Sequence, residues 1–204
     1  MGRIRISAAG LARIELDGKF LVSLNRKFLG AGRRVYTPFG GSLKFYRPAR
    51  DFLRGLGDEF EKDRDIRLKI PEDKITYFEE WFFKRTGREI SPYRELREEL
   101  VDEEKIFKRM SRKVVDLKYA FTAVEVNTPT QRPGHEGEPT NRYLEIYNAR
   151  FNQRYEQMIR TALIKPDTHL ALITRQEIIL GETTEGTEIG TNCGALIPIL
   201  RTHH

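Results

Sequence analysis

Six carboxylates crowd into ten residues just after Arg94, and they are the side chains of this chain best suited to bind a metal. They are Glu95, Glu98, Glu99, Asp102, Glu103 and Glu104. In an α-helix, which turns about 100° per residue, the first four of these share an arc of about 100°. Leu96 and Leu100 lie beside that arc and would form a buried side. Because Mg²⁺ binds oxygen ligands and commonly bridges carboxylates to phosphates, the segment predicts a divalent-metal site; a solvated helix face is the other interpretation.

A basic stretch precedes the acidic segment. Residues 18–50 contain no carboxylate, and the whole chain carries a formal net charge of +6. A basic and an acidic segment in one small protein suit a ligand that is anionic but bound through a metal. Arginine makes bidentate contacts to phosphate, so the outer phosphates of such a ligand could be held by Arg26, Lys27, Arg33 and Arg34.

Local sequence predicts the elements that position these groups. Asp17-Gly18 favours a two-residue hairpin turn between strands at 12–16 and 19–24, because both residues tolerate a positive φ. Gly40-Gly41, in a strand region at 33–45, indicates a sharp bend or a close approach of the backbone. Ser91-Pro92 is typical of a helix start, since serine caps free amides and proline suits the first helical position. We therefore expect a helix through residue 103 that carries the carboxylates.

The rest of the chain predicts mixed α and β structure without the regular βαβ alternation of a doubly wound sheet. Phe78, Phe82 and Phe83 recur at helical spacing near Trp81, and we interpret them as packing residues, not as a base-stacking platform. The expected helices are 49–56, 72–85 and 152–163, the expected strands are 114–126, 143–147, 170–174 and 177–180, and 127–141 is an expected loop.

The composition, 39% hydrophobic and 32% charged, is ordinary for a soluble globular protein. No segment suits a bilayer span or a signal peptide, and the single cysteine, Cys193, cannot form an internal disulfide. We therefore expect a cytoplasmic protein. His135 and His169 lie far apart without a cysteine partner, which argues against a zinc site. His203 and His204 are interpreted as a possible remnant of a purification tag.

The string Arg94-Glu95-Leu96-Arg97-Glu98-Glu99 resembles the core of the Nudix box, an arginine–glutamate pair and a bulky aliphatic residue followed by paired glutamates. The upstream Thr37-Pro38-Phe39-Gly40-Gly41 is similar to the proline and glycines that open that box. The resemblance is closest to SMODS-associated Nudix domains, in which a Trp-Phe segment also precedes the box. It implies an α/β/α sandwich around a mixed β-sheet, formed by one domain over 1–202 with an insertion at about 46–88.

Carried over residue by residue, the resemblance implies that Glu95, Glu98 and Glu99 bind Mg²⁺ or Mn²⁺. Glu98 or Glu99 would also assist the attacking water, and Arg94 would orient the glutamates. Gly40 and Gly41 would let the loop pass beneath the helix, next to the substrate. The implied activity is hydrolysis of a pyrophosphate bond in a nucleoside diphosphate-linked compound, in the setting of bacterial nucleotide-signal defence.

Three features depart from the family pattern. Residues 46–88 separate the glycines from the helix, and Val101 stands where a glycine is expected. The intermediate glutamate of the box has no aligned equivalent, Glu89 being the nearest candidate. A further carboxylate could come from the loop that carries Glu136 and Glu138.

Two other functions stay open from the sequence. The first is a Nudix-like sensor that binds a nucleotide without turning it over, which the departures in the box would suit. The second is a nucleic-acid-binding domain, supported by a pI of about 9.4 but by no helix-turn-helix, finger or RNP-like motif. A homodimer with Trp81 and its neighbouring aromatics at the interface is also compatible with the sequence.

Overall fold

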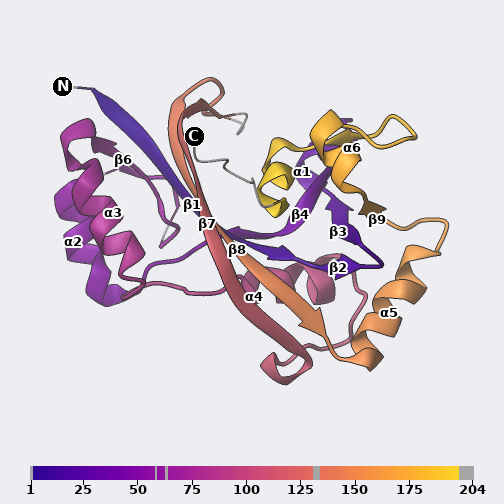
Figure 1. Cartoon of the computed structure of the whole chain (residues 1–204). Coiled ribbons are helices and arrows are strands. Elements are labelled where there is room, and N and C mark those ends of the chain that lie inside the picture. Colours follow the sequence, from indigo (N-terminus) through magenta and orange to yellow (C-terminus); the bar gives the residue numbers. More distant parts are fainter. Residues whose placement is uncertain (1, 58, 63, 131–133, 198–204) are drawn as a thin grey trace, which may run out of the picture. The chain divides into compact units, whose positions relative to one another are not determined.

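The computed structural model describes residues 2–57, 59–62, 64–130 and 134–197 (Figure 1). The predicted tag remnant, His203 and His204, lies outside the described residues. The chain forms two compact units: unit 1 is Met1–Gly10, Gly41–Pro92 and Phe121–Glu145, and unit 2 is Leu11–Gly40, Tyr93–Ala120 and Ile146–His204. Four strands contribute residues to both units: β1 (Arg3–Arg13), β4 (Val35–Ser42), β7 (Val115–Pro129) and β8 (Pro139–Phe151). The predicted insertion, 46–88, falls within unit 1.

The sheet of unit 2 is built on β3 (Lys19–Leu24). This strand pairs antiparallel with β2 (Glu15–Leu16), β4 and β9 (Leu170–Ile173), whereas β10 (Glu188–Ile189) pairs parallel with β4, so the sheet is mixed. The turn between β2 and β3 has φ values of 53° at Asp17 and 74° at Gly18, which confirms the predicted hairpin.

Helices cover both faces of this sheet. Because side chains alternate along a strand, Leu21 and Val22 of β3 enter two different cores. Leu21 packs in a cluster that includes helix α4 (Tyr93–Arg97), the π-helix η3 (Glu98–Glu103) and α5 (Gln153–Leu163). Val22 packs with α6 (Arg175–Leu180) and the 3₁₀-helix η5 (Thr191–Leu196), where Cys193 is buried. Helix–sheet–helix layering confirms the predicted fold class, an α/β/α sandwich around a mixed sheet.

Unit 1 joins strands to an aromatic helical core. Residues Arg3–Ser7 of β1 pair antiparallel with β6 (Arg67–Pro71), which also pairs with β5 (Glu59–Phe60). Helices α2 (Arg50–Leu56) and α3 (Ile75–Phe83) contact each other. Phe78 and Phe82 are fully buried and lie 5.2 and 5.3 Å, between ring centroids, from Tyr143. This packing confirms the prediction for Phe78 and Phe82, whereas Trp81 is partly buried against the same core and Phe83 is 50% exposed.

The remaining elements are short. They are α1 (Arg26–Gly30) and the 3₁₀-helices η1 (Arg47–Ala49), η2 (Glu72–Lys74) and η4 (Arg112–Val114). In the described part of the chain, no helix has the length and apolar character of a membrane span.

Three sequence predictions need correction. The strand expected at 177–180 is wrong, because this segment is helix α6: Thr174 and Glu177 form a reciprocal capping box, and Gly181 ends the helix with φ 79°. The loop expected at 127–141 is shorter, since β7 runs to Pro129 and β8 starts at Pro139. The helix expected at 91–103 begins at Tyr93 and widens into a π-helix from Glu98.

Candidate functional site: an acidic helix against a glycine loop

The acidic helix, α4 together with η3, is anchored to unit 2 by two leucines. Leu96 and Leu100 are fully buried and share a core cluster with Ile14 of the hairpin and Phe39 of β4. Spacing of four residues places both leucines on one side of the helix. The glutamates of the segment therefore lie on the other sides of a helix whose position is set by the sheet.

Glu99 is the member of the acidic segment most affected by its surroundings. Its Oε2 accepts a hydrogen bond of 2.7 Å from the backbone N–H of Gly40. Burial raises the pKa of Glu99 well above its ordinary value, the Gly40 hydrogen bond opposes this, and the charges of Glu103, Glu95 and Glu104 raise the pKa further. Gly40 itself has φ 126°, a conformation that favours glycine. The first glycine of the pair thus contacts the acidic helix through its backbone N–H.

Arg94 lies between the other two predicted metal ligands. Its Nη1 is 2.5 Å from Glu95 Oε1 and 3.5 Å from Glu98 Oε2. The side chains of Arg94 and Glu95 are each 25% exposed, whereas that of Glu98 is 43% exposed. One guanidinium therefore forms ion pairs with two of the three glutamates.

The π-helical turn brings two further carboxylates to the site. The N–H of Glu104 donates to the carbonyl oxygen of Glu99 at 2.8 Å, across five residues, which is the wider spacing of a π-helix. Glu103 and Glu104 consequently act electrostatically on Glu99. At the ordinary α-helical angle Glu104 would lie on the side of the helix opposite Glu95, so the density of carboxylates is the sequence signal that pointed to it.

Of the basic side chains expected to hold phosphate, Arg26 is brought to the acidic helix. Asn25 caps α1 by accepting from the N–H of Lys27, and Arg26 then reaches the end of η3. There its Nη2 donates to the carbonyl oxygen of Glu103, and its Nε lies 3.5 Å from Glu103 Oε2 and 3.8 Å from Glu104 Oε1.

The other predicted phosphate ligands have different surroundings. Arg33 makes two 2.8 Å hydrogen bonds to Glu188 and lies over the ring of Phe28, and Arg34 is exposed. Gly41, the second glycine, belongs to unit 1.

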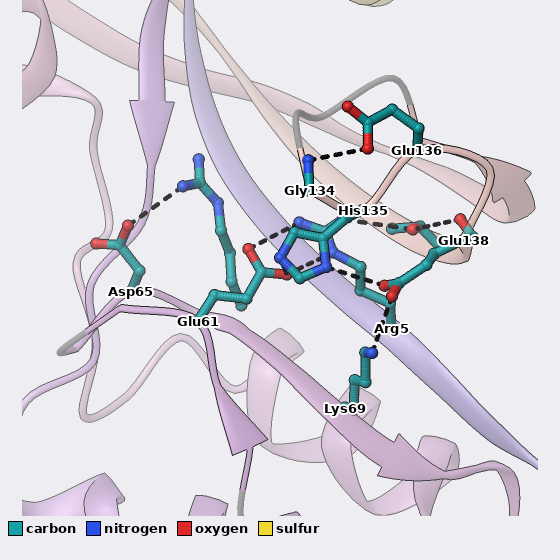
Figure 2. A network of polar contacts seen from close by, with 10 residues as sticks. Arg5, Glu61, Asp65, Lys69, Gly134, His135, Glu136 and Glu138 are labelled. Carbon is teal, nitrogen blue, oxygen red and sulfur yellow. Dashed lines mark hydrogen bonds and ion pairs between the residues drawn. The ribbon is translucent and has the colours of Figure 1, made fainter.

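The carboxylates proposed as extra ligands have local partners in unit 1. Figure 2 shows Glu138 in contact with Lys69 and His135, and Glu136 in contact with Gly134. Glu138 accepts from Lys69 Nζ at 2.9 Å and lies 3.1 Å from His135 Nδ1, while Glu136 accepts from the N–H of Gly134 at 2.9 Å. Glu89, the candidate for the intermediate glutamate, accepts from the N–H of Lys44 at 2.9 Å.

The donor set of the acidic helix fits a hard divalent cation. Among the described residues, no three His, Cys, Asp or Glu side chains are already gathered as a metal centre. Glu99, however, is a desolvated carboxylate with three other carboxylates acting on it. This concentration of negative oxygen is what Mg²⁺ or Mn²⁺ would offset, because both favour carboxylate ligands.

Three features define a Nudix-type domain. They are a mixed sheet layered between helices, a glycine loop hydrogen-bonded to Glu99, and an arginine that lies between Glu95 and Glu98. A family model described as the SMODS-associated NUDIX domain matches residues 3–197, and the chain belongs to that family. Comparisons with curated proteins and with solved structures gave no match.

Proposed function

We propose that this protein is a metal-dependent hydrolase that cleaves a pyrophosphate bond in a nucleoside diphosphate-linked compound. The observation that carries this proposal is the contact between Glu99 and the Gly40 amide, inside a group of carboxylates that act on one another. The family match over 3–197 supports it, and also supports one Nudix-like domain with an insertion at 46–88.

In this proposal Glu95, Glu98 and Glu99 hold Mg²⁺ or Mn²⁺ against the diphosphate. The bound cation would supply Lewis-acid chemistry, neutralising phosphate charge and lowering the pKa of water. Arg94 keeps Glu95 and Glu98 in place, and either Glu98 or Glu99 assists the attacking water.

The substrate would be held by the backbone of the glycine pair and by arginine side chains. Gly40 and Gly41 let the backbone approach the substrate closely. Arg26 lies beside the acidic helix, so it is the arginine best placed to bind a phosphate. Arg33 and Arg34 are proposed to contact more distant parts of the ligand. Arg33 would first have to leave its hydrogen bonds to Glu188. A role in bacterial nucleotide-signal defence and a place in the cytoplasm are part of the same proposal, and the family is described as SMODS-associated.

The test is incubation with a panel of nucleoside triphosphates, dinucleoside polyphosphates, ADP-ribose and cyclic dinucleotides, with Mg²⁺, Mn²⁺ or a chelator, followed by mass spectrometry. Glu98→Gln and Glu99→Gln are the test variants, and Glu72→Gln is the control, because Glu72 is an exposed carboxylate of unit 1 outside the candidate ligands. Metal-dependent cleavage that is lost in the test variants and kept in the control supports the hydrolase. Binding without cleavage that persists in chelator would replace it by the nucleotide sensor.

A further inference from the structure

A histidine lies at the end of the acidic helix. His169 Nδ1 is 3.5 Å from Glu104 Oε2, and the two side chains are 41% and 9% exposed. The position of His169 follows from the sheet: β9 pairs with β3, and the carbonyl oxygen of His169 accepts from the N–H of Leu24 at 2.9 Å. Leu24 ends β3, two residues before Arg26. The ends of two neighbouring strands thus bring a histidine and an arginine to the same carboxylate.

The two internal histidines differ in how their ring nitrogens are occupied. His135 has a carboxylate at each nitrogen, Glu138 at 3.1 Å from Nδ1 and Glu61 at 3.9 Å from Nε2 (Figure 2). His169 has Glu104 beside Nδ1, and within the described part of the chain no partner is found for its Nε2. A carboxylate beside Nδ1 favours the tautomer that carries its proton there, in which Nε2 is an available base. His135 is held by carboxylates at both ring nitrogens, whereas the Glu104 contact of His169 involves Nδ1 alone.

We propose that His169 is the general base that takes the proton from the water assisted by Glu98 or Glu99, and that Glu104 is the positioning residue of His169. This inference rests on the proposed hydrolase. Nε2 of His169 takes a proton from water as the water oxygen forms a bond to phosphorus. The bond between that phosphorus and the bridging oxygen breaks, and its electron pair stays on the departing phosphate. The products are two phosphate compounds and one proton, which His169 later releases to solvent.

Charged groups from each neighbouring element define the electrostatic surroundings of His169. Glu104 faces it from the end of η3, and Arg26, from α1, lies 3.8 Å from the carboxylate of Glu104 and 3.5 Å from that of the neighbouring Glu103. From the turn before β9, Lys165 and Asp167 are exposed. A distance of 3.5 Å is long for a hydrogen bond, and such contacts in enzymes commonly shorten when substrate binds.

The kinetic test uses variants that separate the base from its contact with Glu104. His169→Asn keeps a donor near the position of Nδ1 but has no base at Nε2, and His135→Asn is the matched control in unit 1. A positioned general base contributes about 10²- to 10⁴-fold, so kcat of His169→Asn should fall by at least about 100-fold with little change in KM. The acidic limb of the kcat–pH profile should disappear, and added imidazole should rescue His169→Gly. Glu104→Gln should lower kcat by about 10- to 100-fold.

A second readout does not depend on turnover. Nitrogen-15 NMR of labelled histidine should show neutral His169 protonated on Nδ1, and Glu104→Gln should shift the tautomer towards Nε2–H. An Nε2–H tautomer in the wild-type protein, or a His169→Asn variant with normal kcat, would overturn the inference while leaving the hydrolase standing. If the wild-type protein cleaves no compound of the panel, both proposals fall.

Discussion

Replacing Glu99 by glutamine should stabilise the protein in the absence of metal. Glu99 is buried among like charges, and burial is the first cause of its raised pKa. Each unit by which folding raises a carboxyl pKa destabilises the native state by about 1.4 kcal/mol at neutral pH. Glutamine has no charge to desolvate, and its carbonyl oxygen can still accept from Gly40. We therefore expect the unfolding free energy of Glu99→Gln to exceed that of wild type by about 1–3 kcal/mol. Such a gain is common when a charged residue of a functional site is neutralised.

The gain should depend on pH with a defined sign. Below the ordinary value of 4.5 the carboxyl of Glu99 is protonated in both the folded and the unfolded chain, so the variant has no advantage. As pH rises through 4.5, the unfolded chain loses this proton first while the folded protein retains it, and the stability of the wild-type protein falls. The full difference is reached above the raised pKa of the folded state.

The assay is thermal unfolding of both proteins in chelator at pH 4 and pH 8. For a chain of this size, 1 kcal/mol corresponds to about 2–4 °C in Tm. Glu98→Gln is the matched control. The Glu98 side chain is 43% exposed, so the unfolding free energy of this variant should stay within about 0.5 kcal/mol of wild type. Equal stability of Glu99→Gln and wild type at pH 8, or the same gain at both pH values, would refute the electrostatic reasoning.

Three other predictions concern packing and the glycine loop. Arg88 and Glu145 form a buried pair at 2.8 Å, so Arg88→Met should lower the urea-unfolding free energy by about 3–5 kcal/mol, and adding Glu145→Gln should restore part of it. Burial raises the pKa of the Cys193 thiol to about 12, so a disulfide reagent at pH 8 should label it only after unfolding; rapid labelling of the native protein would contradict this. Gly40→Ala should cost about 1–3 kcal/mol because its φ is 126°, whereas Gly30→Ala, in open space, should be nearly neutral.

Features that depend on local chemistry were predictable from the sequence. Asp17-Gly18 specifies its hairpin because few residue pairs tolerate two positive φ values. The acidic helix could be located because its leucines and its arginine–glutamate string are contiguous. The burial of Phe78 and Phe82 followed from their spacing on one helix face.

Features that depend on tertiary contacts were not predictable. A short apolar run such as Ile178–Leu180 suits a strand or a helix equally, and the capping box at Thr174 was the overlooked signal. The ordinary helical angle places Glu104 outside the arc of Glu95 and Glu99, because the local sequence does not show that the helix widens into a π-helix at Glu98. Charge alone could not show that Arg26 lies at the acidic helix while Arg33 pairs with Glu188.

The most direct test of the central claim is cleavage of the nucleotide panel in water enriched in oxygen-18, followed by mass spectrometry of the products. The account predicts that each cleavage places one oxygen-18 in one of the two phosphate products. It also predicts that the reaction requires Mg²⁺ or Mn²⁺ and is lost in Glu99→Gln. Cleavage that continues in chelator or in Glu99→Gln, or a folded protein that cleaves none of the compounds, would contradict the account.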